Sequence, residues 1–192
     1  MKELEKEILE KGIIINSEIV KIDSFLNHQI NIELFMKIAQ HFKKHFADRK
    51  VDKIMTIETS GIALAFAAAL EFKTKNLVFA KKNKSAITGD NVYKSEVYSF
   101  TKKGTNTITI DKMYVQPGEN ILIVDDFLAA GSAGCGLIDI CRQAGANVVG
   151  FAVAVEKSFQ GGRKKIEDLG VKVYSGASIK SIENGTIIFD HR

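Results

Sequence analysis

The sequence is poor in residues that punctuate or cross-link a chain: its 192 residues include one proline, no tryptophan and two cysteines. So few cysteines argue against a disulfide-stapled secreted fold, and we expect Cys135 and Cys141 to be reduced and structural. The longest apolar run, 62–70, is too short to cross a bilayer, and the charged N-terminus has no apolar segment of signal-peptide length. We therefore expect a cytoplasmic protein of one domain, without a membrane partner.

The sequence also lacks a strong excess of either charge. Lys and Arg number 27 against 23 Asp and Glu, a net charge of +4, and no nucleic-acid-binding motif accompanies the basic clusters at 81–84, 102–103 and 163–165. We expect solvated faces there, above all at 163–165, and no nucleic-acid partner. The same positive field would attract a small anionic substrate. His41 and His45 have no third ligand in view, which predicts surface histidines and no metal site.

Apolar periodicity predicts helices that alternate with strands along most of the chain. Such alternation implies an α/β fold with a mostly parallel central sheet that helices cover on both faces. In such sheets, ligands bind at the carboxyl ends of the strands. The predicted helices are 34–46, 62–72, 133–144 and 163–169, the strands are 53–57, 77–80, 121–124 and 148–155, and a hairpin joins 92–100 to 107–115.

Three predicted strand ends carry polar groups. Glu-Thr-Ser-Gly at 58–61, Asp-Asp at 125–126 and Glu-Lys at 156–157 each follow a buried strand. Because parallel strands end at one edge of their sheet, these three segments are expected to meet there. The sequence therefore predicts one binding site built from three distant segments.

The stretch DDFLAAGSAG, residues 125–134, places two carboxylates before a loop of small residues that leads into a helix. Backbone N–H groups at a helix N-terminus bind phosphate, and small side chains let it approach closely. The GxxGxG spacing at 131–136 fits neither the dinucleotide fingerprint nor a P-loop, so a plain tight turn is the alternative. The acids would bind a ribose diol or Mg²⁺, unless they only face solvent or the helix dipole. Diol and phosphate together describe a ribose 5-phosphate.

The longer stretch ILIVDDFLAAGSAG, residues 121–134, resembles the phosphoribosyl-pyrophosphate motif of the type I phosphoribosyltransferases. Further segments resemble the members of this family that act on xanthine, so that the likeness runs nearly end to end. These segments are KIDSFLNHQI (21–30), TIETSGIA (56–63), VFAKKNKSAI (78–87), VYSFTK (97–102) and VEKSFQGGR (155–163). The resemblance implies a single phosphoribosyltransferase domain over 1–192, with a central mostly parallel sheet, flanking helices and a flexible hood from about 12–30 and 81–103.

The resemblance also implies roles for single residues. Asp125 and Asp126 would be the catalytic acids and face the ribose. Many relatives carry threonines at the end of the phosphate loop, where Ser132 and Ala133 leave one hydroxyl fewer. The 5-phosphate would be bound by Ala129, Ala130, Gly131, Ser132 and Ala133, the pyrophosphate group by Thr59, Ser60 and Gly61, and the purine by Val20, Asn27 and Lys157.

For activity, the resemblance implies a purine-salvage enzyme that moves 5-phosphoribosyl from phosphoribosyl pyrophosphate to xanthine, giving xanthosine 5'-monophosphate and pyrophosphate. Mg²⁺ would arrive with phosphoribosyl pyrophosphate. Basic residues from 81–84 would reach a neighbour's site in a homodimer. Two alternatives stay open: a transferase for guanine, hypoxanthine or adenine, and a non-catalytic regulator that binds phosphoribosyl pyrophosphate.

The implied base contacts have plainer explanations as well. A lysine that follows a strand, such as Lys157, is solvated in most proteins, and Asn27 would suit a cap for the helix that begins near residue 31. Phe159 would cover either the base or the core, and we expect the core.

Overall fold

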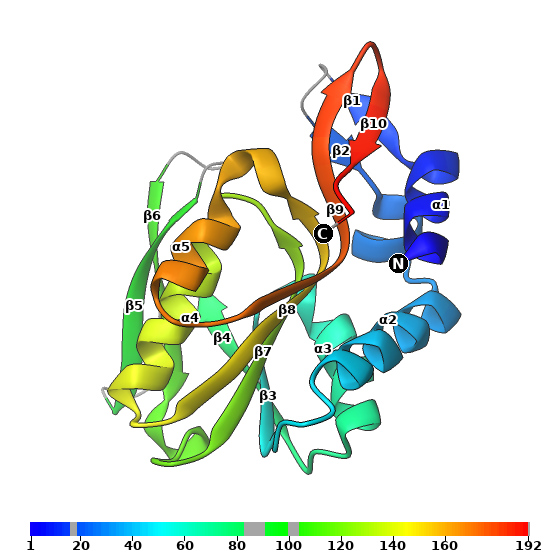
Figure 1. Cartoon of the computed structure of the whole chain (residues 1–192). Coiled ribbons are helices and arrows are strands. Elements are labelled where there is room, and N and C mark those ends of the chain that lie inside the picture. Colours follow the sequence, from blue (N-terminus) through cyan, green and yellow to red (C-terminus); the bar gives the residue numbers. More distant parts are fainter. Residues whose placement is uncertain (16–18, 83–90, 100–103, 192) are drawn as a thin grey trace.

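The computed structural model describes residues 1–15, 19–82, 91–99 and 104–191. Eight of the strands in these residues form one sheet: β3 (Lys53–Ile57), β4 (Leu77–Lys82), β5 (Val92–Ser99), β6 (Gly104–Asp111), β7 (Asn120–Leu128), β8 (Asn147–Lys157), β9 (Val173–Glu183) and β10 (Thr186–Phe189). Their order across the sheet is β10-β9-β8-β7-β3-β4-β6-β5 (Figure 1). The five central strands, β9 to β4, are parallel, and antiparallel pairs flank them at both edges. The predicted mostly parallel sheet is confirmed.

Helices cover both faces of this sheet, as predicted (Figure 1). α1 (Lys2–Lys11), α2 (Ile32–His45) and α3 (Gly61–Phe72) pack on one side, and α4 (Ser132–Gln143) and α5 (Gly162–Asp168) pack on the other. α2 begins at Asn31, whose side-chain oxygen accepts a hydrogen bond from the Leu34 amide at 3.1 Å. Asn27 is therefore not the cap of this helix. None of the described helices is long and apolar enough to span a membrane.

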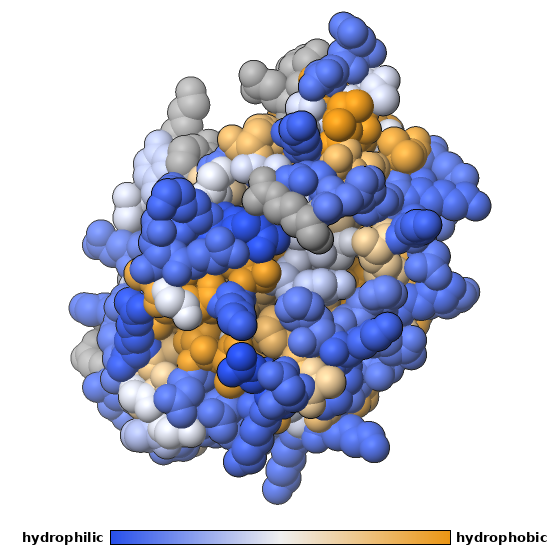
Figure 2. All heavy atoms as spheres, viewed as in Figure 1, coloured by the Kyte–Doolittle hydropathy of each residue, from blue (hydrophilic) through white to orange (hydrophobic). Residues whose placement is uncertain are grey.

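Two regions at the chain ends are regular although the sequence analysis assigned them no element. β1 (Ile13–Ile15) and β2 (Ile19–Lys21) form a small antiparallel sheet, and β9 with β10 forms a hairpin. The amino group of Met1 donates a hydrogen bond to the Gly176 carbonyl of β9, and Leu4 and Ile8 of α1 are fully buried. The first helix and the last hairpin thus pack against each other. Figure 2 shows apolar side chains at this hairpin, and a second apolar area on the same face around α4.

The described parts of the predicted hood are anchored in the core. β5 pairs with β6 along its length, and Val97 of β5 packs on Gly136 of α4, where an added Cβ would lie 2.4 Å from the Val97 Cγ1 atom. In the N-terminal part, Phe25 and Leu26 of the short helix η1 (Asp23–Asn27) are buried. The rest of the predicted hood, residues 16–18, 83–90 and 100–103, lies outside the described residues.

Several details of the sequence analysis are wrong. The second hairpin strand begins at Gly104 and ends at Asp111, because the Asp111 side chain accepts a hydrogen bond from the Met113 amide at 3.0 Å and starts the 3₁₀ turn η2 (Lys112–Tyr114). Phe159 is not a core residue: it lies in the surface turn η3 (Ser158–Gln160) and is 48% exposed. Arg163 does not lie on a solvated face, because it pairs with a buried carboxylate described below.

Candidate functional site

The link between β7 and α4 has the features of an anion site. Gly131 has a φ of +81°, which favours glycine, and the first turn of α4 holds no acidic residue. Within the described residues, the amide N–H groups of Ala130 and Gly131 donate to no protein acceptor. Free amides at the positive end of a helix dipole are the groups that bind phosphate in proteins.

A cavity of about 200 Å³ opens over this link. It brings together Asp125 and every residue predicted to surround the 5-phosphate. Two further residues, Tyr98 and Phe127, were not singled out from the sequence, although Phe127 stands between the acids and the loop. The lining consists of Tyr98, Asp125, Phe127, Leu128, Ala129, Ala130, Gly131, Ser132, Ala133, Gly134 and Phe151.

The remaining glycines of this motif serve packing rather than the loop. A Cβ on Gly134 would lie 2.8 Å from the Ile166 Cδ1 atom of α5 and 2.9 Å from the Phe151 ring. Gly136 faces Val97 in the same close manner. The GxxGxG spacing therefore reflects a helix that lies close to its neighbours, with only Gly131 set in the turn itself.

The two acids are nearly buried at the end of β7. Asp125 is 6% exposed and Asp126 7% exposed, and the Asp126 amide donates a hydrogen bond to Asp125 Oδ1 at 3.0 Å. Burial, and secondly the neighbouring carboxylate, raise the pKa of Asp125 well above its ordinary value, whereas the backbone hydrogen bond and Lys82 act in the opposite direction. A site of this kind favours a ligand that brings hydrogen-bond donors or positive charge to the carboxylates.

The predicted pyrophosphate segment lies next to these acids. A Cβ on Gly61 would come within 2.7 Å of Asp125 Oδ1 and 2.4 Å of Thr56 Oγ1, so the start of α3 and the end of β7 touch. Thr59 is exposed, and Ser60 stands at the N-cap of α3 without using its side chain as a cap. Like α4, α3 has no acidic residue in its first turn. Two helix N-termini therefore flank the acid pair.

The turn that carries Thr59 is fixed to the neighbouring strand. The Glu58 carboxylate accepts a hydrogen bond from the Lys82 amide, and the Glu58 amide donates to the Ala80 carbonyl at 3.0 Å. The peptide bond between Glu58 and Thr59 is cis. β4, which leads into the predicted hood, is thus attached directly to the predicted pyrophosphate segment.

Lys157 lies at the third strand end and is partly shielded from solvent. Its ammonium nitrogen stands 5.5 Å from the centre of the Phe127 ring, a cation–π contact. Burial lowers the pKa of Lys157. The fully solvated lysine of the plainer explanation is therefore not what the structure contains.

Glu156, the neighbour of Lys157, serves a different purpose from the one its strand-end position suggested. It is 1% exposed and accepts hydrogen bonds from Arg163 Nε at 2.9 Å and Arg163 Nη2 at 2.6 Å. The hydroxyl of Ser175 donates to it at 2.9 Å. A buried carboxylate needs such partners, and this need explains why Arg163 turns inward.

The two predicted base contacts in the N-terminal segment differ in exposure. Asn27 ends η1 with an exposed side chain that makes no hydrogen bond to any described residue. Val20 of β2 is 5% exposed, and its side chain belongs to the core beside α1 and α2. The side chain of Val20 is therefore not open to a ligand.

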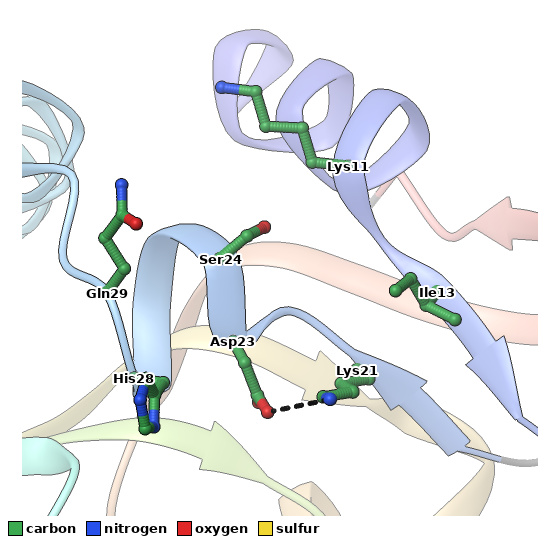
Figure 3. Close-up of a pocket in the computed structure, with 7 residues that line it drawn as sticks. All are labelled: Lys11, Ile13, Lys21, Asp23, Ser24, His28 and Gln29. Atoms are coloured by element: carbon green, nitrogen blue, oxygen red, sulfur yellow. Dashed lines mark ion pairs between the residues drawn. The ribbon is translucent and has the colours of Figure 1, made fainter.

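A second hollow, of about 390 Å³, lies beside Asn27 between α1 and η1. Figure 3 shows Lys21 paired with Asp23 on its floor, at 3.5 Å, near His28, whereas the Lys11 ammonium points away from them. Lys11 pairs with Glu7 at 2.7 Å. Opposite charges are therefore already matched in this hollow.

The histidines and cysteines, for which the sequence predicts no catalytic or metal-binding role, lie away from the acid pair. The His45 ring stacks on Tyr174 at 4.1 Å, and His41 is exposed. Both cysteines are free thiols, and burial raises the pKa of Cys141 to about 12. Neither pair of residues lines the cavity at the acid pair.

Known proteins match this chain in sequence and in fold. A family model described as "Phosphoribosyl transferase domain" matches residues 21–185. Among solved structures, adenine phosphoribosyltransferase from Thermoanaerobacter pseudethanolicus superposes with a TM-score of 0.72 at 24% identity, covering 90% of this chain and 97% of that one. The enzyme from Saccharomyces cerevisiae, solved with adenine, gives 0.71 at 20% identity, covering 91% and 99%. At this identity the likeness concerns the fold alone.

Curated relatives are much more similar. A xanthine phosphoribosyltransferase from Clostridium tetani is 47% identical over 98% of this chain and 100% of its own length. One from Clostridium novyi is 46% identical over 98% and 99%, and one from Bacillus cytotoxicus is 46% identical over 98% and 95%. The chain therefore belongs to the phosphoribosyltransferase family and, within it, to the group of the xanthine phosphoribosyltransferases.

Proposed function

We propose that this protein transfers the 5-phosphoribosyl group from phosphoribosyl pyrophosphate to xanthine, giving xanthosine 5'-monophosphate and pyrophosphate. The observation that carries the proposal is the meeting of the acid pair with two helix N-termini at one edge of the sheet. These groups match a ribose diol that lies between a 5-phosphate and a pyrophosphate. The names of the relatives from C. tetani and C. novyi support xanthine as the acceptor.

In this proposal the loop 129–133 binds the 5-phosphate through backbone amides. The small side chains of Ala129 and Ala130 let the phosphate reach them, and Ser132 adds one hydroxyl. The pyrophosphate group lies against Thr59, Ser60 and Gly61 at the start of α3, where the helix dipole favours negative charge.

Asp125 and Asp126 accept hydrogen bonds from the two ribose hydroxyls in this proposal. Hydroxyl donors favour the ionised form of a carboxyl, so a bound sugar opposes the burial that raises the pKa of Asp125. Mg²⁺ prefers about six oxygen ligands, and two largely buried carboxylates leave most of them to substrate and water. We therefore propose that Mg²⁺ would be held mainly by the oxygens of phosphoribosyl pyrophosphate, beside Asp125 and Asp126, where it would supply positive charge for the leaving group.

The purine lies beside Lys157 and Phe127. The ammonium group carries three donors and no acceptor, so it bonds the 6-oxygen of xanthine and meets the amino group of adenine donor to donor. Asn27 has a free amide on an anchored backbone and donates to the 2-oxygen. Val20 contributes a backbone contact.

In this reaction the protein acts mainly by positioning the substrates and by electrostatic stabilisation, and it forms no covalent intermediate. The anomeric carbon loses pyrophosphate through a cation-like transition state while a purine nitrogen attacks. The nearby carboxylates of Asp125 and Asp126 stabilise positive charge on the sugar. Closure of the predicted hood would keep water from the activated sugar.

We also propose a homodimer whose interface lies on the outer face of α3 and β4. Monomeric proteins rarely expose several large apolar side chains on neighbouring elements. The exposed apolar side chains that we assign to this face, called the α3–β4 face below, are Phe66 and Leu70 on α3, Phe79 on β4, and Met113 and Tyr114 on η2.

The proposal is tested by pyrophosphate release with xanthine, guanine, hypoxanthine and adenine in parallel. We expect the highest kcat/KM with xanthine. With adenine kcat/KM should be lower by at least roughly 10⁴-fold, because a site built around the Lys157 donor rejects a base that presents another hydrogen-bond donor. If guanine gave the highest activity, the proposed base would be guanine instead of xanthine, and the proposed phosphoribosyl transfer would stand. No turnover with any base, despite binding of phosphoribosyl pyrophosphate, would point to a non-catalytic regulator instead.

Replacement of Lys157 tests the base contact directly. Lys157→Ala should lower kcat/KM about tenfold to a hundredfold for all three 6-oxopurines, since a hydrogen bond from a charged group contributes about 1.5–3 kcal/mol. Lys164→Ala is the matched control, because Lys164 is exposed and, among the described residues, bonds only Asp168. Equal activity of the Lys157 variant and the wild type would remove Lys157 from the base site.

A further inference from the structure

The phosphate loop is held from behind by the segment that follows Lys157. The Gly162 amide donates a hydrogen bond to the Ala129 carbonyl at 3.1 Å, and the Lys165 ammonium donates to the Ala130 carbonyl at 3.0 Å. Both contacts use carbonyl oxygens of the loop. The amides of Ala130 and Gly131 remain without acceptors among the described residues.

The contact between the two segments leaves no spare room. A Cβ on Gly162 would lie 2.2 Å from the Ala129 carbonyl oxygen and 2.8 Å from the Gly131 nitrogen. A Cβ on Gly131 would lie 3.0 Å from the Gly162 Cα atom. Since each peptide plane carries its N–H opposite its C=O, fixing the carbonyls from one side sets where the amides point.

The segment is itself fixed by the buried ion pair of Glu156 and Arg163. Arg163 bonds both oxygens of Glu156 and also donates from Nη1 to the Val173 carbonyl at 2.9 Å. In the sheet, Glu156 is the register partner of Leu128, the residue just before the loop. The ion pair thus anchors the start of α5 to β8, which carries Lys157, at the position that lies beside the end of β7 and the start of the loop.

We propose that the ion pair of Glu156 and Arg163, together with Gly162, is a positioning device that holds the phosphate loop in its binding geometry. The inference rests on the proposed function and extends it: residues that touch no substrate set the affinity for the 5-phosphate. Because Lys157 begins the same segment, the base contact and the phosphate loop have one support. A small displacement of such a support would turn the loop amides away from the 5-phosphate and weaken the affinity for it.

The first test is Gly162→Ala, with Gly161→Ala as matched control. Gly161 has a positive φ, +73°, whereas Gly162 does not, and a Cβ on Gly161 would meet no atom of the described residues within 4 Å. We expect Gly162→Ala to raise the KM for phosphoribosyl pyrophosphate and the Kd for ribose 5-phosphate about tenfold or more, with a smaller change in kcat at saturation. Gly161→Ala should share any loss of thermal stability and leave both constants within about twofold of the wild type.

A second variant decides the matter if Gly162→Ala does not fold. Arg163→Lys keeps the charge and loses the paired donors, and Lys164→Arg makes the reverse change on the exposed neighbouring residue. We expect Arg163→Lys to raise the KM for phosphoribosyl pyrophosphate about threefold or more, and Lys164→Arg to leave it unchanged.

The outcomes separate this inference from the proposed function. A wild type that binds phosphoribosyl pyrophosphate, with equal KM and Kd in Gly162→Ala or in Arg163→Lys, would overturn the positioning device and leave the reaction standing. A fall in kcat and active fraction without a change in KM would mean a merely structural role and would also overturn it. A wild type that binds neither phosphoribosyl pyrophosphate nor ribose 5-phosphate would overturn both.

Discussion

Asp125 is a residue whose charge and surroundings conflict. Its carboxyl is almost fully buried beside a second carboxyl, and both effects raise its pKa. The chain gains from an ionised Asp125 only when a ligand supplies donors or positive charge. Stability of the free protein and affinity for the sugar are therefore opposed at this one position.

The variant Asp125→Asn separates the two effects. The raised pKa means that ionisation is disfavoured in the folded state, so the wild type loses stability as pH rises above the ordinary value of 3.8. Asn has no such loss and keeps an oxygen for the Asp126 amide. We expect a higher melting temperature than the wild type near pH 7, a difference that shrinks as pH falls towards 4, measured by scanning calorimetry.

The same change made at both acids should impair the reaction. Changing Asp125 and Asp126 together to Asn should reduce kcat/KM for phosphoribosyl pyrophosphate at least about tenfold, because each charge-assisted hydrogen bond contributes about 1.5–3 kcal/mol. Circular dichroism checks that the sheet is intact. A folded double variant with wild-type kinetics would contradict the assignment of the acids to the diol.

At the level of elements, the central α/β part was predictable because its patterns are local. Strands such as β7 contain continuous apolar runs, and α4 starts directly after a loop of small residues that ends at Gly131. The order of elements then fixes a parallel sheet and the edge at which the site lies. Residues 58–61 follow β3 and residues 156–157 end β8, as predicted. β7, however, continues to Leu128, so the acids at 125–126 lie inside its last paired stretch rather than after the strand.

The elements at the chain ends were missed for two different reasons. α1 is so rich in charge that only Leu4 and Ile8 mark its buried face, which is too few for a periodic signal. The β9–β10 hairpin did carry a signal, since Asn184 and Gly185 form the strongest short-range hairpin dipeptide, and both have positive φ. That dipeptide in the printed sequence would have placed the hairpin.

Within the site, contacts between side chains distant in sequence were beyond the reach of pattern reading. Nothing local distinguishes Arg163 from Lys164 and Lys165, yet only Arg163 meets the buried Glu156. In the sequence Phe127 is likewise an ordinary apolar strand residue, and only the structure shows the Lys157 ammonium over its ring. A partner across the sheet decides such roles, and a single sequence does not display it.

For the whole molecule, the α3–β4 face makes a prediction about assembly. Phe66→Glu and Leu70→Glu together should convert a dimer to a monomer in analytical ultracentrifugation, because two charges would enter a desolvated interface. Ile188→Glu, on the apolar hairpin of Figure 2, is the control and should leave the mass unchanged. A double variant that stays dimeric would place the interface elsewhere.

The order of the strands also has a consequence for folding during synthesis on the ribosome. β3, β7 and β8 lie side by side although long stretches of chain separate them, and contacts over such separations form slowly. A growing chain, extended by roughly 5–20 residues per second, holds the predicted pyrophosphate turn long before β8 leaves the ribosome. Until β8 emerges, β7 has only one of its two neighbours, β3, and a sugar phosphate finds no completed edge to bind. The substrate can therefore stabilise the finished fold but cannot template the early one.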